Sequence, residues 1–241
     1  MDLGLRGRRA AVAAASAGLG LASAKALAAD GVTVAICGRD RGRIDAAAAQ
    51  VGEGCIPLVA DVSDAAGGAS FVAAATEALG GLDILVTNAG GPPSGTMAST
   101  AVDAYPAAID LNLMSVIGMV KAAVDPLREQ GWGRIVAITS ISVRQPIAEL
   151  ILSNTARAGV TGFLKTAARE LAGTGVTVNS VQPGLHRTGR VTQLYGDDAD
   201  FSAMGDPDDF GAIVAFLCSD AAGYITGAAL PVDGGAYAGL L

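Results

Sequence analysis

Two glycines near the N-terminus have the spacing of a loop that binds a pyrophosphate. Gly18 and Gly20 follow an apolar run and stand at the start of a helical stretch. Glycines let a backbone approach a phosphate closely, and a helix N-terminus supplies unpaired N–H groups and the positive end of a dipole. We expect this loop to contact a dinucleotide, although a tight turn without a ligand would use the same glycines. The loop residues expected at the nucleotide are Ala14, Ser16, Gly18, Leu19 and Gly20.

An arginine follows the second apolar run, where nucleotide-binding folds distinguish the two forms of the adenosine ribose. The sequence there is Cys37-Gly38-Arg39-Asp40. A guanidinium can pair with a 2′-phosphate, whereas NAD sites usually carry a carboxylate at the end of the strand itself. Arg39 therefore predicts NADP(H) as the cofactor. A plain surface arginine is the alternative, and Asp40 would weaken the argument if it turned back onto the ribose.

Two further polar segments follow the third and fourth apolar runs. They are Asp61-Val62 and Asn88-Ala89-Gly90. Because α/β sheets bind ligands at the carboxyl ends of their strands, we expect both segments to lie at the ligand-binding edge.

The apolar runs alternate with helical stretches in a way that predicts a parallel sheet covered on both faces. The runs are nearly continuous, which is typical of strands buried on both faces. Strands are predicted at residues 10–15, 33–37, 56–60, 84–87, 134–139, 176–181 and 225–232. Helices are predicted at residues 19–29, 41–51, 65–79, 104–130, 153–172 and 208–219. Short links and right-handed crossovers make these elements one doubly wound α/β domain over residues 1–241.

The composition limits the kinds of partner. The 241 residues include 16 Lys and Arg against 23 Asp and Glu, a net charge of −7 that argues against nucleic acid and a polybasic membrane contact. No run approaches about 18 uninterrupted apolar residues, so no membrane span is predicted. The single histidine excludes a multi-histidine metal site, and no metal is predicted. Three scattered cysteines predict reduced, buried thiols and a cytoplasmic protein.

Seven segments, in the same order, resemble the motifs of the short-chain dehydrogenase/reductase family. They are AAASAGLG, ADV, TNAG, LNL, GRIVAITS, QPG and VDGG, and they extend over essentially the whole chain. The chain is similar in particular to 3-oxoacyl-carrier-protein-reductase-like members with an NAGGPP loop, here residues 88–93.

This resemblance implies a Rossmann fold with about seven parallel strands, an NAD(P) cofactor and assembly as a homotetramer or homodimer. It places Asp61 and Val62 at the adenine. Nucleotide-contacting roles are also implied for Asn88, Ala89, Gly90, Pro183, Gly184 and Thr188. Residues 185–205 become the variable loop over the substrate, in which Arg187 or Arg190 could grip a carboxylate or a phosphate.

The nucleotide loop departs from the family pattern T-G-x-x-x-G-x-G at its first two positions, which hold Ala13 and Ala14. Ala14 replaces the glycine of the first tight turn. A Cβ is tolerated there if φ stays negative, so we expect binding to survive in an altered geometry.

The catalytic residues depart more strongly. The family uses Asn, Ser and a Tyr-x-x-x-Lys pair, and Asn112 and Ser140 match. Ser153, thirteen residues after Ser140, and Arg157 replace the tyrosine and lysine, with i,i+4 spacing on one helix face. A neighbouring cation lowers the pKa of a tyrosine from about 10, whereas a serine hydroxyl titrates far higher. Arginine has no lone pair to accept a proton, so Arg157 is expected to hold ribose hydroxyls rather than relay protons.

Three residues could replace the missing tyrosine as the proton donor. His186 lies two residues after Gly184, and its reference pKa of about 6.5 suits proton transfer. A loop histidine without a catalytic role is the alternative. Tyr195 and Glu149 are weaker candidates.

Three interpretations of the function follow. The first is an NADP(H)-dependent oxidoreductase that transfers a hydride to or from a carbonyl or alcohol substrate, with an acyl thioester among the candidates. The missing Tyr and Lys favour a second, a non-redox cyclase, lyase or isomerase on the same fold. The third is a catalytically silent binding subunit.

Overall fold

The computed structural model describes residues 2–196 and 201–240, which contain one parallel sheet of seven strands. The strand order is β3-β2-β1-β4-β5-β6-β7, and every neighbouring pair is parallel. The strands are β1 (Arg9–Val12), β2 (Thr33–Gly38), β3 (Ile56–Val59), β4 (Ile84–Thr87), β5 (Gly133–Ile138), β6 (Val176–Pro183) and β7 (Ala229–Val232). The predicted Rossmann fold is confirmed, and the order of the strands reverses between β1 and β4, where such folds bind their ligands.

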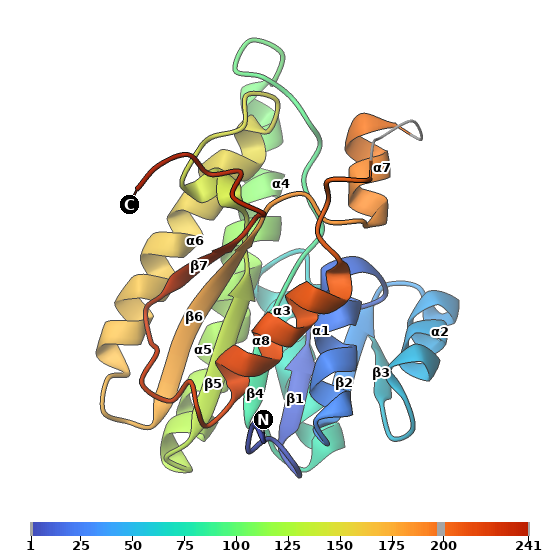
Figure 1. Ribbon diagram of the computed structural model, residues 1–241, viewed down its shortest axis with the longest axis vertical. Helices are drawn as coiled ribbons and strands as arrows, with labels where there is room; N and C mark the ends of the chain where they lie inside the picture. Colours follow the sequence, from blue (N-terminus) through green and yellow to red (C-terminus); the bar gives the residue numbers. More distant parts are fainter. Residues whose placement is uncertain (1, 197–200, 241) are drawn as a thin grey trace.

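Helices cover both faces of the sheet (Figure 1). One face carries α1 (Gly18–Ala29), α2 (Arg41–Val51) and α8 (Pro207–Cys218), and the other carries α3 (Ala65–Leu79), α5 (Ser115–Glu129) and α6 (Ile151–Glu170). Each face buries its own apolar cluster against the central strands. This arrangement explains why the strands read as continuous apolar runs.

Glycines set how closely the paired helices approach. A Cβ at Gly68 of α3 would lie 2.6 Å from the Ser115 carbonyl oxygen of α5, and one at Gly118 would collide with the Ala65 backbone. On the other face, a Cβ at Gly211 of α8 would collide with Ala22 of α1. These glycines therefore allow the helices of each pair, α3 with α5 and α1 with α8, to pack closely.

The predicted helix over residues 104–130 is interrupted. It consists of a 3-10 turn η1 (Val102–Ala104), α4 (Tyr105–Ile109), a π-helical turn η2 (Asp110–Met114) and α5. Apolar periodicity predicted the length of this region correctly, but it carries no signal for the one extra residue that a π turn inserts. The turn contains Asn112, one of the expected catalytic residues.

The continuous stretch Val102–Glu129 is long and apolar enough to cross a membrane by length and composition, with a mean hydropathy of 1.6. No membrane span is predicted from the sequence, because no uninterrupted apolar run approaches about 18 residues. A core helix of a globular domain passes the same test, and α5 packs its apolar face against the sheet beside α3. One such helix is weak evidence for a membrane.

The predicted irregular loop over residues 185–205 contains a short helix, α7 (Gly189–Tyr195), and residues 197–200 lie outside the described part. The predicted strand over residues 225–232 begins only at Ala229. The predicted strand over residues 10–15 ends at Val12, because the chain turns at Ala14, where φ is +47°.

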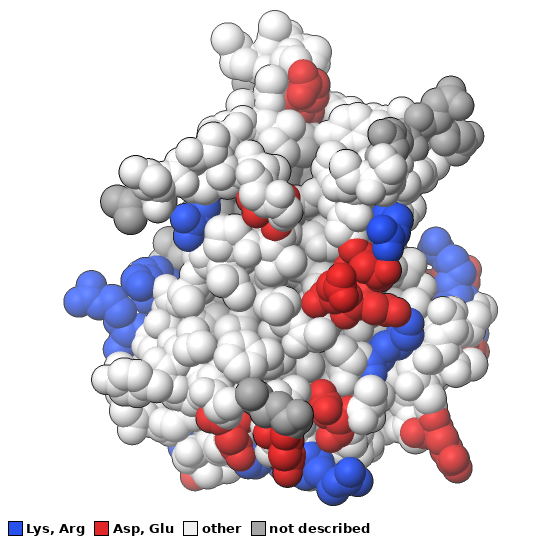
Figure 2. Space-filling model, in the orientation of Figure 1, with Lys and Arg blue, Asp and Glu red and all other residues white. Residues whose placement is uncertain are grey.

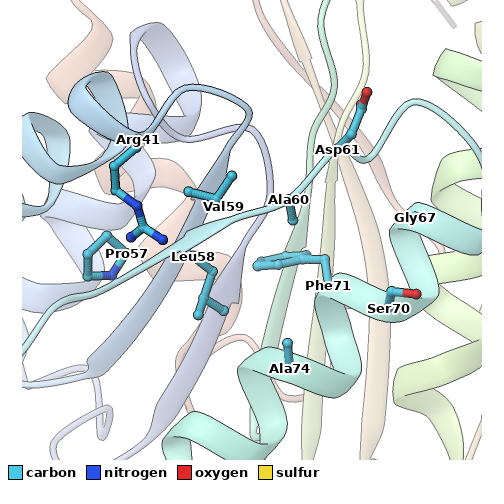
Figure 3. A pocket seen from close by; sticks show the side chains of 10 residues that line it. All are labelled: Arg41, Pro57, Leu58, Val59, Ala60, Asp61, Gly67, Ser70, Phe71 and Ala74. Atoms are coloured by element: carbon cyan, nitrogen blue, oxygen red, sulfur yellow. The ribbon is translucent and has the colours of Figure 1, made fainter.

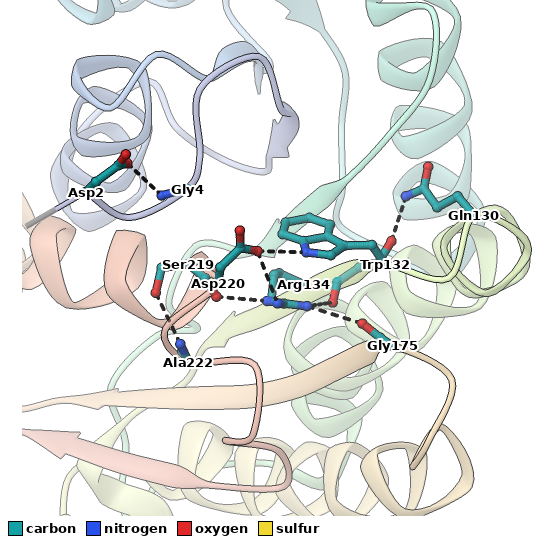
Figure 4. Close-up of polar contacts among 10 residues, drawn as sticks. Asp2, Gly4, Gln130, Trp132, Arg134, Gly175, Ser219, Asp220 and Ala222 are labelled. Carbon is teal, nitrogen blue, oxygen red and sulfur yellow. Dashed lines mark hydrogen bonds and ion pairs between the residues drawn. The ribbon is translucent and has the colours of Figure 1, made fainter.

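Two arginines brace the amino ends of the strands, away from the expected site. Arg9 of β1 donates to both carboxylate oxygens of the buried Asp83, at 2.8 and 3.0 Å. Arg134 of β5 donates to the Ser219 carbonyl and stacks on Trp132, whose ring nitrogen donates to Asp220 (Figure 4). These contacts join β1 to the residue that precedes β4, and β5 to the end of α8.

We expect Asp83→Asn to cost about 2 kcal/mol of unfolding free energy at pH 7, because it leaves Arg9 without its partner. Burial opposes ionisation of Asp83, but the hydrogen bonds and charge of Arg9 outweigh it and lower the pKa of this carboxyl below its ordinary 3.8. A depressed pKa stabilises the fold above pH 3.8, and that stabilisation is lost as pH falls through the folded value.

Urea denaturation at pH 7 and pH 3 checks this, with Asp125→Asn, an exposed aspartate beside Arg128, as the control. The Asp83→Asn cost shrinks at the lower pH, and the control changes stability by less than about 0.5 kcal/mol at both. Equal costs for the two variants would contradict the assignment.

Candidate active site

The loop between β1 and α1 is anchored to both strands that flank β1. The Ala13 N–H donates to the Val86 carbonyl of β4 at 3.0 Å, and the Ala15 N–H donates to the Cys37 carbonyl of β2 at 2.9 Å. The loop therefore sits at the switch point of the sheet. Ala17, at the N-cap of α1, has no capping side chain, and the first turn has no acidic residue. The unpaired N–H groups and the positive dipole end fit an anionic group such as a pyrophosphate.

Gly20 and Asn88 hold this loop in place. The Asn88 side-chain amide donates to the Ala14 carbonyl at 3.1 Å. A Cβ at Gly20 would lie 2.8 Å from both the Ala14 oxygen and the Asn88 nitrogen, so no larger residue fits. Gly18 has a φ of +60°, and Thr188 lies over it, with 3.6 Å between the Thr188 methyl and the position of a Cβ. The structure thus brings together the glycine loop and two residues expected at the nucleotide.

The condition under which a Cβ at Ala14 would be tolerated, a negative φ, is not met. The φ of Ala14 is +47°, the only positive value at a described non-glycine residue. The backbone keeps the left-handed turn of the family's glycine, although a Cβ makes that conformation costly. The Ala14 N–H donates to the Cys37 sulfur at 3.4 Å, and burial raises the pKa of that thiol to about 12, so it stays neutral.

Arg39 and Asp40, which follow β2, have different surroundings. Arg39 is exposed and makes no hydrogen bond or ion pair with the residues that the structure describes. Asp40 is the N-cap of α2, where its carboxylate accepts the Arg43 N–H at 2.8 Å. The side chain of Asp40 is therefore engaged at the helix, which leaves Arg39 as the charged group free to meet a ribose substituent.

Asp61 lies at the end of a groove along the outer edge of β3 (Figure 3). Residues of β3 and α3 line this groove, and Arg41 lies on its far side. Asp61 is exposed and accepts the Ser63 N–H at 3.0 Å, whereas Val62 is buried in the core under α3. The two residues expected at the adenine thus stand at the carboxyl end of β3, one facing solvent and one facing inward.

Ser153 and Arg157 lie together at the start of α6, as their spacing predicts. The Arg157 Nε donates to the Ser153 hydroxyl at 3.2 Å, and Nη1 donates to the Ile138 carbonyl at the end of β5, also at 3.2 Å. Ser140 follows β5 by two residues, and its hydroxyl accepts the Ser142 N–H at 3.0 Å. The bond to Ile138 thus brings the serine–arginine pair to the strand end that leads into Ser140.

The charge of Arg157 has no neutralising partner among the described residues. Burial, together with the positive charge of Arg190, lowers the pKa of its guanidinium to about 10. Arg157 remains a cation at neutral pH, so the site presents a desolvated positive charge beside the Ser153 hydroxyl.

Asn112 occupies the π turn η2 and faces the segment that follows β4. Its amide nitrogen donates to the Gly90 carbonyl at 2.9 Å, and its side chain is 2% exposed. Its buried Oδ1 has no partner in the described residues. π turns often occur at functional sites, and an unsatisfied buried oxygen calls for a donor from a ligand or water.

The three candidate proton donors differ in burial: one is buried and two are exposed. His186 is buried edge-on against Phe210, with ring centroids 5.2 Å apart, and its Nδ1 faces the Gly184 carbonyl at 3.2 Å. That environment favours a packing role. Tyr195 and Glu149 are exposed. Pro183 is the last residue of β6 and Gly184 follows it, where a Cβ would lie 2.8 Å from the Asp233 Cα. No group of three metal-ligating side chains occurs in the described ranges.

The chain is similar to known proteins over nearly its whole length. The family model described as enoyl-(acyl carrier protein) reductase matches residues 13–237. The 3-oxoacyl-[acyl-carrier-protein] reductase of Vibrio harveyi is 33% identical over 98% of this chain and 99% of its own.

Two solved structures are similar over nearly the whole chain. L-sorbose reductase of Gluconobacter frateurii, in complex with NADPH and L-sorbose, has a TM-score of 0.91 and 28% identity and covers 100% of both chains. An apo short chain oxidoreductase of Pseudomonas aeruginosa has a TM-score of 0.89 and 30% identity, covers 98% of this chain and 99% of its own, and is described as containing an atypical catalytic center.

We expect Ala14→Gly to stabilise the protein by about 0.5–1 kcal/mol. Glycine removes a left-handed penalty of about 1–2 kcal/mol and gives back part of it as unfolded-state entropy. Urea denaturation measures the change. Ala46→Gly, at an exposed position inside α2, is the control and should lose about 1 kcal/mol. A loss of similar size at both positions would show that Ala14 is not strained.

Proposed function

Because the chain belongs to the short-chain dehydrogenase/reductase family, we propose that it is an NADP(H)-dependent reductase of small-molecule carbonyl compounds with a serine–arginine pair in the catalytic position. The observation that carries this proposal is the Ser153–Arg157 pair, hydrogen-bonded to each other and to the strand end that leads into Ser140. Asn112 and the glycine loop complete the same edge of the sheet. The substrate class includes ketones and 3-oxoacyl thioesters, and the reverse reaction would oxidise an alcohol.

The residues present fit an NADP(H) cofactor, which supplies a hydride when bound. Gly18, Gly20 and the uncapped start of α1 suit a pyrophosphate. Arg39 is free to pair with a 2′-phosphate, while Asp40 caps α2 and so does not compete for the ribose. The NADPH bound to the Gluconobacter reductase supports this choice.

The chain's own groups polarise the carbonyl and hold the substrate. The Ser153 oxygen accepts the Arg157 Nε–H, so its hydroxyl proton points elsewhere, and no acceptor among the described residues engages it. Ser140 likewise uses its oxygen as an acceptor, towards Ser142, and keeps its proton for a ligand. Both hydroxyls would donate to the carbonyl oxygen, and the Arg157 charge would stabilise the negative charge that develops there.

We expect the rate of carbonyl reduction to be modest. A serine hydroxyl and an arginine do not form a tuned general acid, and loss of a positioned acid typically costs about 10²–10⁴ in rate. Water would supply the final proton. The atypical center described for the Pseudomonas neighbour supports the idea that this fold carries non-standard catalytic groups. The same substitution keeps a non-redox lyase or isomerase as the second candidate function.

We further propose a cytoplasmic homotetramer or homodimer. Tyr224 and Leu240 are fully exposed, as is part of Leu230 on the edge strand β7, and symmetric assembly would bury such residues. On the face seen in Figure 2, the described basic residues lie in small separate groups and form no broad basic surface, which suits a protein without a nucleic-acid partner.

Arg39→Ala should weaken NADPH binding about ten- to hundredfold and leave NADH binding nearly unchanged. The lost phosphate–guanidinium pair is worth about 1.5–3 kcal/mol. Fluorescence titration of both cofactors gives the ratio. Arg43→Ala, which removes the same charge from the same segment, is the control. Equal losses for NADPH and NADH in Arg39→Ala would remove the argument for a 2′-phosphate site.

The double variant Ser153→Tyr with Arg157→Lys should raise ketone reduction, by up to the 10²–10⁴ attributed to a general acid. It returns a phenol beside an ammonium group that lowers its pKa. Steady-state NADPH oxidation with a ketone panel measures the gain, and Arg157→Lys alone is the control. If the double variant folds and binds NADPH normally but reduces no ketone, the proposed reductase site is wrong.

A further inference from the structure

Arg144 connects the turn that carries Ser140 to the end of the sheet. Ser140 is the N-cap and Arg144 the C-cap of the 3-10 turn η3 (Ile141–Val143). The Arg144 Nε donates to the Gln182 Oε1 of β6 at 2.8 Å, and its Nη2 donates to the Ala229 carbonyl of β7, also at 2.8 Å. One side chain thus joins the Ser140 turn to two neighbouring strands.

The acceptor on β6 is a buried amide. Gln182 is 1% exposed, and Arg144 is the one donor that its Oε1 meets among the described residues. Leaving a buried acceptor without its donor is costly, and a bond from a charged donor is stronger than one between neutral groups. The bond therefore holds the Arg144 side chain in one place, although the residue lies at the surface.

Gln182 directly precedes Pro183 and Gly184, the segment expected to hold the nicotinamide. The ring of Pro183 fixes its own φ. The Gly184 N–H donates to the Val232 carbonyl at 3.0 Å, and the Asp233 backbone packs on Gly184 where a Cβ would lie. There is little freedom, therefore, between the Gln182 side chain and the segment expected at the nicotinamide.

The segment after β7 closes a circuit of contacts back to Arg144. The Asp233 Oδ2 accepts the Tyr237 N–H at 2.9 Å. The guanidinium carbon of Arg144 lies 5.5 Å from the centroid of the Tyr237 ring, within the range of a cation–π contact. The contacts run from Arg144 along the end of β6 to Asp233, and return through Tyr237.

The turn η3 transmits the position of Arg144 to Ser140. The Ser140 hydroxyl accepts the Ser142 N–H at 3.0 Å. The Arg144 N–H donates to the Ile141 carbonyl at 2.9 Å. Because these bonds close one compact turn, a shift of Arg144 also shifts Ser140.

We propose that Arg144 is a positioning residue that sets the Ser140 hydroxyl relative to the nicotinamide, an inference that rests on the proposed reductase function. Ser140 would donate to the carbonyl oxygen. Hydride from NADPH beside Pro183 and Gly184 joins the carbonyl carbon, and a proton from water joins the oxygen, which gives the alcohol and NADP⁺. Such a transfer needs reacting atoms about 3–3.5 Å apart, and the bond from Arg144 to Gln182 keeps the two sides at a fixed separation.

The first test is Arg144→Met, which keeps much of the side-chain stem and removes both donors. We expect kcat for ketone reduction to fall about tenfold, while KM for the ketone and Kd for NADPH change by less than about twofold. A merely structural role would lower stability or weaken binding without this split. Arg144→Lys, which keeps an N–H donor, should recover part of the loss. Arg169→Met, at an exposed arginine in the last turn of α6, is the matched control.

The second test is a double-mutant cycle with Gln182→Leu, which removes the acceptor and also serves if Arg144→Met fails to fold. Both single variants should lose about the same kcat, and the double variant should be no slower than either, because all three lack one bond. Losses that add in the double variant overturn the inference. Ketone reduction by the unmodified protein with an unchanged kcat in Arg144→Met overturns this inference alone, whereas no reduction by the unmodified protein overturns the reductase proposal as well.

Discussion

The buried charge of Arg157 is the constraint on which the arrangement of the site depends. It stands at the end of the sheet without a carboxylate in the described residues, held by a serine hydroxyl and a backbone carbonyl. These two bonds orient the Ser153 proton away from the arginine and pin the start of α6 to the end of β5. Neither of these partners carries a negative charge, which fits the proposed role of Arg157 in stabilising an oxygen that gains negative charge.

An arginine in this place differs from a lysine in more than size. A lysine's ammonium can depress the pKa of a tyrosine and exchange protons, whereas a guanidinium keeps its proton and presents a planar fork of donors. In the proposed reductase, the serine–arginine pair would therefore supply fixed electrostatic stabilisation in place of a tuned general acid. Arg190 of α7 donates to the Pro92 carbonyl, and this bond ties α7 to the segment that follows β4.

Much of the fold was predictable because its signals are local. Apolar runs located the strands, and the helix predicted over residues 208–219 corresponds to α8, where Asp206 is the N-cap and accepts the Asp208 N–H. The meeting of Ser153 and Arg157 followed from i,i+4 spacing. The π turn at Asn112, the left-handed Ala14 and the burial of His186 were not predictable, because each depends on contacts with segments distant in sequence. The close approach of the Arg190 guanidinium to the backbone of Gly91 likewise joins distant segments and has no local signal.

The most direct test of the central claim is isotope transfer from the cofactor. The protein would be incubated with NADPH that carries deuterium at C4 of the nicotinamide, together with a panel of ketones and oxo acids, and the alcohol products analysed by mass spectrometry. The account expects one deuterium on the carbinol carbon of the product, absent when Ser153 and Arg157 are both replaced by alanine. Saturable NADPH binding with no deuterium in any product would contradict a reductase and favour a non-redox role for the site.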